Sequence, residues 1–251
     1  MGREVVAAVA GAQDLELVAA VDPSFAGTDL ATLVPGAPAI TVAADLEALE
    51  AAGAQVAVDF TAPSVAQGNI EWLTSHGVHG VVGTTGLDEA AVAAAVESGS
   101  SNLLLAANFA IGAVLLMEFA KQAVRYLPNV EVIELHHDQK VDAPSGTATH
   151  TAREIARARR EAGHAVPVDP TTHESAQGSR GAEIDGIHVH ALRLPGLVAH
   201  EEVIFGGVGQ TLTIRHDSID RRSFMDGVLL GVRAVGETPG LTVGLDKILA
   251  S

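Results

Sequence analysis

The chain has 251 residues, 47% hydrophobic and 18% charged, a composition typical of a folded globular protein with a substantial core. Its 31 acidic residues against 15 Lys and Arg give a net charge of −16, which argues against nucleic acid or an anionic membrane as a partner. It has no cysteine, no apolar run of membrane-spanning length and no signal-peptide pattern, so we expect a cytoplasmic protein without disulfides or cysteine metal sites.

The first half of the chain alternates apolar runs with helix-forming segments. We predict four short strands, at residues 15–22, 55–61, 77–86 and 102–110. Helices are predicted at residues 2–13, at 64–76 with Ser64 as the cap, after Asp88, and at 112–127. Strands that are apolar on both faces and alternate with helices indicate βαβ units and a parallel sheet.

The second half follows a different pattern. We predict a strand at 130–137, a helix from Pro144 to about residue 162, a polar loop at 171–183 and a final amphipathic helix at 221–235. Residues 187–194 and 201–216 alternate with period two, which is typical of half-exposed antiparallel strands. The chain therefore reads as a nucleotide-binding α/β domain followed by an α+β domain.

Candidate cofactor contacts follow the predicted strands. Asp22 ends the strand at 15–22, where a carboxylate in a doubly wound dinucleotide fold hydrogen-bonds the adenosine ribose. The sequences GTTG (83–86) and AANF (106–109) each follow a strand, and ligands of such sheets bind at the carboxyl ends of the strands. Ordinary turns are the alternative interpretation.

The stretch ELHHDQKVDAPSGTA (134–148) combines groups that suit a small anion. His136 and His137 can exchange a proton near neutral pH, and Lys140 supplies a positive charge. The Pro-Ser-Gly-Thr turn (144–147) begins a helix, where backbone N–H groups bind carboxylates well. Two alternatives are a metal site, which the opposite directions of adjacent strand residues disfavour, and solvated histidines beside a helix cap.

This stretch resembles the signature of the bacterial dihydrodipicolinate reductases, or 4-hydroxy-tetrahydrodipicolinate reductases, of the lysine and diaminopimelate pathway. The resemblance extends through DFT, GTTG, AANF, RLPGLVAHEEVIFGGVGQTLTIRHDS and RRSFMDGVLLGVR, and covers almost the whole chain. It implies an oxidoreductase that uses NADH or NADPH to reduce a small dicarboxylate, and a homotetramer assembled through the C-terminal sheet. It also implies a Rossmann-like doubly wound parallel sheet and an α+β domain with an open mixed sheet.

The resemblance assigns roles to particular residues. His136 is expected to be the catalytic proton donor and Lys140 the second one, and no metal is expected. The substrate-binding residues are expected to be His137, Ser145, Gly146 and Thr147. The cofactor-binding residues are expected to be Gly2, Asp22, Phe60, Gly83, Thr84, Thr85, Ala106, Ala107, Asn108 and Phe109. The implied domains are 1–108, completed by 221–251, for the dinucleotide, and 109–220 for substrate binding and oligomerisation.

The sequence departs from this family at its start. The family opens with a strand and a glycine fingerprint, G-x-x-G-R-M-G, whose end aligns with Met1 and Gly2, so we expect the first strand to be missing. A non-catalytic remnant that only binds dicarboxylates or forms oligomers is the alternative function. Because Pro23, Ser24 and Phe25 offer no cation beside Asp22, we expect NADH to serve at least as well as NADPH.

Overall fold

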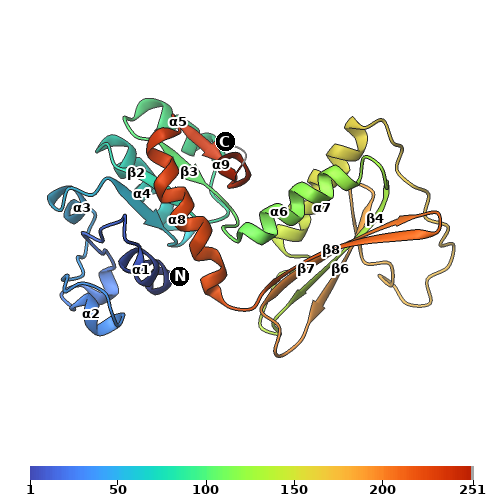
Figure 1. Cartoon of the computed structure of the whole chain (residues 1–251), viewed down its shortest axis with the longest axis horizontal. Helices are drawn as coiled ribbons and strands as arrows, with labels where there is room; N and C mark the ends of the chain where they lie inside the picture. The colour runs from blue at the N-terminus through green and yellow to red at the C-terminus, as the bar shows by residue number, and fades with distance from the viewer. Residues whose placement is uncertain (250–251) are drawn as a thin grey trace. The chain divides into compact units, whose positions relative to one another are not determined.

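The computed structural model describes residues 1–249, and the chain divides into two compact units. The first unit contains residues 1–110 and the segment from residue 221 onward. The second unit contains residues 111–220. Each unit has its own sheet (Figure 1).

The first unit is built on a four-stranded parallel sheet in the order β1-β2-β3-β9. Its strands are β1 (Val56–Asp59), β2 (His79–Val82), β3 (Leu103–Leu105) and β9 (Leu241–Val243). The main helices are α1 (Gly2–Gly11), α4 (Pro63–Ser75), α5 (Glu89–Ser98) and α8 (Met225–Ala234). The short elements are η1 (Pro23–Phe25), α2 (Leu30–Leu33), α3 (Glu47–Ala51), η2 (Arg221–Phe224), η3 (Val235–Glu237) and α9 (Asp246–Leu249).

Both faces of this sheet are buried, as the apolar strand sequences require. On one face, Val82, Leu103 and Leu105 pack with apolar side chains of α4 and α5. On the other face α8 lies close to the strands, because a Cβ at its Gly231 would be 2.7 Å from the Leu104 side chain. Helices on both faces of a parallel sheet confirm the predicted doubly wound fold.

Two predictions for this unit are wrong in detail. Residues 15–22 form no strand but a single parallel bridge, Val21 to Ala43, because within residues 1–249 they have no neighbouring strand with which to build a ladder. Helix α4 begins at Pro63, with Ala62 as its N-cap and no cap from Ser64. Proline favours the first helical position, since its missing N–H would have no acceptor there.

The second unit is a five-stranded mixed sheet in the order β5-β6-β4-β7-β8, with two helices on one face (Figure 1). The strands are β4 (Asn129–His136), β5 (Ala182–Ile184), β6 (Ile187–Arg193), β7 (Ala199–Gly207) and β8 (Gln210–Ser218). The helices are α6 (Ile111–Ala123) and α7 (Gly146–Glu161). Strand β6 pairs antiparallel with β5 and parallel with β4, so the predicted mixed sheet is confirmed, and the antiparallel pattern expected for residues 187–194 holds on one side only.

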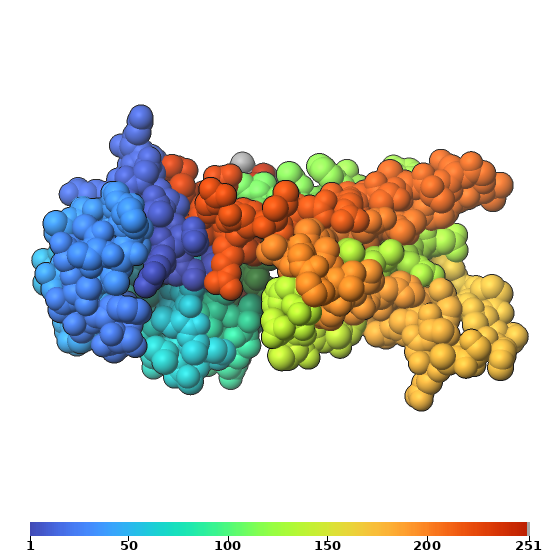
Figure 2. Space-filling view, turned by 90° about the horizontal axis from the view of Figure 1, so that it is seen from below, coloured from blue at the N-terminus to red at the C-terminus, as the bar shows by residue number. Residues whose placement is uncertain are grey.

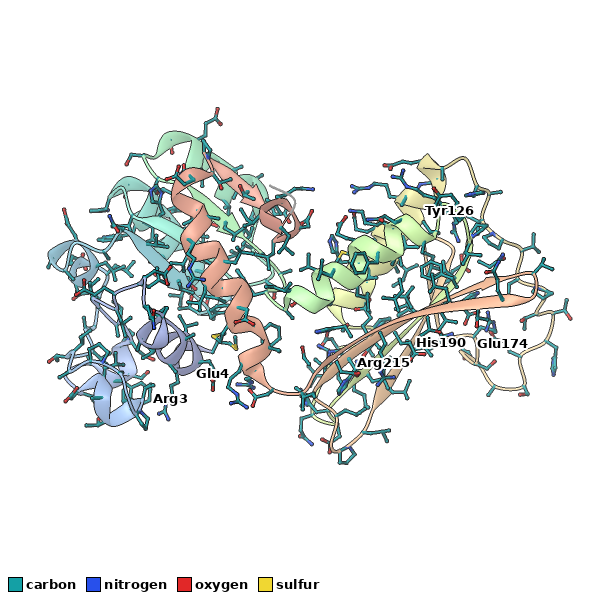
Figure 3. The ribbon with its side chains drawn as sticks, viewed as in Figure 1. Arg3, Glu4, Tyr126, Glu174, His190 and Arg215 are labelled. Carbon is teal, nitrogen blue, oxygen red and sulfur yellow. The ribbon has the colours of Figure 1, made fainter. Side chains whose placement is uncertain are left out.

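Alternation along the strands sorts the side chains of this sheet onto two faces. Val132, Val203 and Phe205 point to α6 and α7 and are fully buried. Ile133, Glu202 and Arg215 belong to the opposite face. Arg215 of β8 and His190 of β6 are labelled in Figure 3. The segment 165–181 forms part of the surface of this unit (Figure 2), where Arg180 bridges Asp169 and Glu131.

Within the part of the chain that the structure describes, no helix is long and apolar enough to cross a membrane.

Candidate active site

Three of the predicted cofactor segments lie at one edge of the parallel sheet. Asp59 ends β1, Val82 ends β2 and Leu105 ends β3, and these three residues are register partners. Phe60, the turn 83–86 and the segment 106–109 therefore leave the sheet side by side. This edge is where ligands of open α/β sheets bind.

Asp59 joins two of these segments and was not identified from the sequence. Its carboxylate is buried and accepts hydrogen bonds from the Thr61 N–H and hydroxyl, both at 2.7 Å, and from Asn69 Nδ2 at 2.7 Å. It also accepts one from the Thr84 hydroxyl at 3.2 Å. The carboxylate therefore fixes the ends of β1 and β2 relative to each other.

Gly83 lies where only a glycine fits. A Cβ at this position would be 2.0 Å from Cε1 of Phe60. The Phe60 ring packs edge-on against Phe109, with ring centroids 5.6 Å apart. Thr85 and Ala107 are exposed beside this pair, and Asn108 Oδ1 accepts a hydrogen bond from the Ala110 N–H at 2.8 Å.

The other two predicted cofactor residues lie outside the sheet. Asp22 was predicted to end a strand, but it is the N-cap of η1. Its Oδ1 accepts a hydrogen bond from the Ser24 N–H at 2.9 Å. Gly2 is the first residue of α1. Arg3, also on α1 (Figure 3), places its guanidinium 5.8 Å from the Phe25 ring centroid, so a cation does lie close to the Asp22 turn.

The second unit holds His136 through a buried carboxylate. His136 Nδ1 lies 2.6 Å from Oε2 of Glu134, whose side chain is fully buried. Glu134 Oε1 accepts from the Ser145 N–H at 3.0 Å, and Arg193 donates to both carboxylate oxygens, at 2.7 and 2.8 Å. Burial opposes the charge of Glu134, but these hydrogen bonds outweigh it and lower its pKa to about 2.

The predicted anion-binding turn follows directly in the chain. Ser145 is the N-cap of α7, and its hydroxyl accepts from the Ala148 N–H at 3.1 Å. The first helical N–H groups, of Gly146 and Thr147, have no acceptor within the helix and are free for an anion. Lys140 Nζ is held 2.7 Å from Asp142 Oδ1, and His137 is exposed at the end of β4.

The structure thus brings His136, Lys140 and the turn 144–147 into one connected network, in which Glu134, Arg193 and Asp142 are additions to the predicted residues. Arg193 joins the network through Nη2, which donates to the Asp142 carbonyl at 2.7 Å. Within residues 1–249 there is no group of three His, Asp or Glu residues suited to a metal ion.

A second buried carboxyl lies opposite Glu134. Glu201 on β7 is the register partner of Glu134, and within residues 1–249 its Oε1 has no hydrogen-bond partner. Burial, with the charge of Glu134 adding to it, raises the pKa of Glu201 to about 7, although the Thr151 hydroxyl opposes the shift. His216, its partner on β8, offers no compensating charge at neutral pH because burial lowers its pKa.

Glu201→Gln is expected to stabilise the protein at pH 8 and to have little effect at pH 5. The folded state holds the Glu201 proton more tightly than the unfolded state, so this group's contribution is present below pH 4.5 and is lost as the pH rises through about 7. The substitution should recover about 1–3 kcal/mol at pH 8. Thermal melts of both proteins at the two pH values test this; an equal difference in melting temperature at both would contradict it.

Both halves of the chain match models of one protein family. Residues 1–109 match the family model described as dihydrodipicolinate reductase, N-terminus, and residues 112–249 match the model of its C-terminus. A 4-hydroxy-tetrahydrodipicolinate reductase from Nocardia farcinica is 52% identical over 253 residues, covering 99% of this chain and 94% of the relative. One from Corynebacterium aurimucosum is 51% identical with the same coverage.

A solved structure gives the same result. A dipicolinate-bound dihydrodipicolinate reductase from Paenisporosarcina sp. TG-14 superposes with a TM-score of 0.85 at 40% identity, covering 98% of this chain and 94% of that one. An amine dehydrogenase from Mycobacterium smegmatis, at 15% identity and a TM-score of 0.60, shares the fold alone. The two family models, the curated relatives and the superposition confirm the resemblance seen in the sequence: this chain belongs to the dihydrodipicolinate reductase family.

Proposed function

We propose that the protein reduces 4-hydroxy-tetrahydrodipicolinate to tetrahydrodipicolinate with NADH or NADPH, in lysine and diaminopimelate biosynthesis, and that it does so in the cytoplasm. The observation that carries the proposal is the network around Glu134, which holds His136 and the anion-binding turn at Ser145 with one carboxylate. A proton donor beside a carboxylate site is what reduction of an unsaturated dicarboxylate requires.

The first unit has a suitable site for the cofactor. Gly83 lets the Phe60 ring lie directly against the turn after β2, and the three strand-end segments let backbone approach a dinucleotide closely. We assign cofactor binding to the residues predicted from the sequence, with Asp22 at the ribose. The bound nicotinamide supplies the hydride, and Phe60 and Phe109 give the site an apolar wall that excludes water.

The second unit has a suitable site for a dicarboxylate. Gly146 and Thr147 are the first residues of a 16-residue helix. Their N–H groups lie at its N-terminus, the positive end of the helix dipole, which favours a carboxylate. Lys140 and His137 lie on the segment before this turn and can contact the other polar groups of the substrate. The solved relative has dipicolinate, a dicarboxylate, bound, which supports this assignment.

The reaction consumes one hydride and one proton and releases water. We assign the proton to His136, whose Nδ1 is committed to Glu134 and whose Nε2 is therefore the nitrogen that exchanges protons. Lys140, paired with Asp142 in this structure, supplies positive charge to the substrate carboxylate and a second proton source.

Turnover of the purified chain with 4-hydroxy-tetrahydrodipicolinate tests the function, with loss of reduced-cofactor absorbance as the readout.

We expect kcat/KM with NADH to equal or exceed that with NADPH, because Asp22 repels a 2′-phosphate. Arg3 is the nearby cation that softens this repulsion, so Arg3→Ala should lower kcat/KM for NADPH several-fold more than for NADH. Dicarboxylate binding without turnover would contradict the proposal, and a tenfold preference for NADPH would contradict the assignment of Asp22.

We further propose that the chain forms a homotetramer through the sheet face that α6 and α7 leave uncovered. This face carries Ile133 and Ile204 beside Glu202 and Arg215, which form an ion pair at 2.8 Å. Apolar residues framed by charges on an open sheet face are typical of an assembly surface.

Ile204→Arg is therefore expected to dissociate the assembly, since it places a large charged side chain within an apolar contact. Light scattering after size-exclusion chromatography measures the mass. Tyr126→Asp, at an exposed position after α6, is the control and should leave the mass unchanged. A variant Ile204→Arg of unchanged mass would place the interface elsewhere.

A further inference from the structure

Glu134 makes four hydrogen bonds although its side chain is fully buried. Oε2 accepts from His136 Nδ1 and from Arg193 Nη1, and Oε1 accepts from the Ser145 N–H and from Arg193 Nη2. Each oxygen therefore contacts one arm of Arg193 and one element of the proposed site. A buried charge is stable only when it is paired and hydrogen-bonded in this way.

The charge of Glu134 decides which nitrogen of His136 carries a proton. Because its hydrogen bonds outweigh burial and lower its pKa to about 2, Glu134 is ionised at neutral pH and can only accept. Nδ1 of His136 must then be the donor in the 2.6 Å contact. The second ring nitrogen, Nε2, is left as the atom that gains and loses the proton.

The same carboxylate determines where the helix N-terminus lies. The Ser145 N–H donates to Glu134 rather than to solvent, and it immediately precedes the N–H groups of Gly146 and Thr147. Arg193 extends this arrangement, since its Nη2 also binds the Asp142 carbonyl and the Asp142 side chain holds Lys140. One ion pair thus contacts His136 and the turn directly, and is linked to Lys140 through Asp142.

We propose that Glu134, clamped by Arg193, is a positioning residue for the reaction. It fixes His136 in the tautomer with Nδ1 protonated, and it fixes the carboxylate-binding turn at a set distance from His136. The inference rests on the proposed function for its kinetic consequences, but its structural content does not depend on turnover. Glu134 acts through His136 and through Ser145, and does not itself exchange a proton with substrate.

Nitrogen NMR of the histidine rings in the unmodified protein is the first test, because it needs no turnover and uses a variant only to assign the signal. We expect neutral His136, assigned by its loss from the spectrum of His136→Ala, to be protonated at Nδ1. A neutral ring protonated at Nε2 would overturn the proposal. If the protein has no reductase activity while His136 is protonated at Nδ1, the proposed function fails and the positioning role of Glu134 stands.

Glu134→Gln is the second test, because an amide keeps the shape of the side chain and removes its charge. We expect kcat to fall roughly 10²-fold and KM for the substrate to rise several-fold. Glu201→Gln makes the same change in the neighbouring buried carboxyl, the register partner of Glu134, and should leave kcat unchanged.

A double-variant cycle separates positioning from general damage to the fold. In a His136→Ala background, Glu134→Gln should lower kcat less than about threefold, because the residue through which it acts is gone. Its effect on KM should persist, because the turn at Ser145 is still released. An equal loss of kcat in both backgrounds would overturn the proposal and show that Glu134 is structural only.

Discussion

His136→Ala and Lys140→Ala are each expected to lower kcat by roughly 10²- to 10⁴-fold, the usual span for loss of a general acid. Both side chains are held in place by partners rather than packed in the core: His136 by Glu134 at 2.6 Å and Lys140 by Asp142 at 2.7 Å. Their removal should therefore affect proton transfer more than folding, and the melting temperature should change little.

Steady-state kinetics with saturating cofactor measures these losses. His150→Ala and Lys121→Ala are matched controls in the same unit, because His150 is exposed on α7 and Lys121 pairs with Glu118 on α6. Both controls should retain normal kcat. A His136→Ala variant with near-normal kcat would exclude His136 as the proton donor, and a Lys140→Ala variant changed only in KM would restrict Lys140 to substrate binding.

The parallel sheet of the first unit could be predicted because its signal is local. Each of β1, β2 and β3 is a short apolar run followed by a turn residue and a helix, and βαβ units align their carboxyl ends. Residues 15–22 carry the same local pattern and form no strand. Ladder formation depends on a partner, which no local pattern encodes.

The network around His136 shows where prediction from sequence stops. The histidines, the lysine and the Ser-Gly-Thr turn lie within one short stretch of the chain, so their combined chemistry could be inferred from the sequence. Arg193 is 59 residues from Glu134, and the two meet only because β6 pairs in parallel with β4, bringing His136 opposite Arg193. The period-two pattern is typical of antiparallel strands and gives no register, so it did not place Arg193 at the site.

The burial of certain polar residues was also not predicted from the sequence. An arginine on a helix is usually solvated, yet Arg159 of α7 is 1% exposed and donates to the Asp185 and Gly186 carbonyls. Glu201 and Glu202 are adjacent acids, but strand alternation puts only Glu201 inside. A polar side chain is expected to be exposed unless a distant backbone group or a buried partner supplies its hydrogen bonds. Such partners come together only in the tertiary structure, so local sequence does not reveal them.

Gly83→Ala is expected to weaken NADH binding by about tenfold or more. The new Cβ would overlap the Phe60 ring, at 2.0 Å from Cε1. Either the ring leaves its edge-on contact with Phe109, or the turn moves. Movement of the turn would strain the 2.8 Å hydrogen bond that the Gly83 N–H donates to the Asp59 carbonyl. Overpacking of this kind costs about 1–3 kcal/mol, and 1.4 kcal/mol is a tenfold change in affinity.

Calorimetric titration of NADH into Gly83→Ala gives this loss directly, and Gly68→Ala is the control. Gly68 lies in α4 with no atom within 4 Å of a Cβ built there, so alanine should leave cofactor affinity unchanged and favour the helix. The double variant Gly83→Ala with Phe60→Ala removes the ring that the methyl group meets. If the clash is the cause, the double variant should bind NADH more tightly than Gly83→Ala alone. Unchanged affinity in Gly83→Ala would mean that the turn after β2 does not contact the cofactor, and the strand-end site would then be wrong.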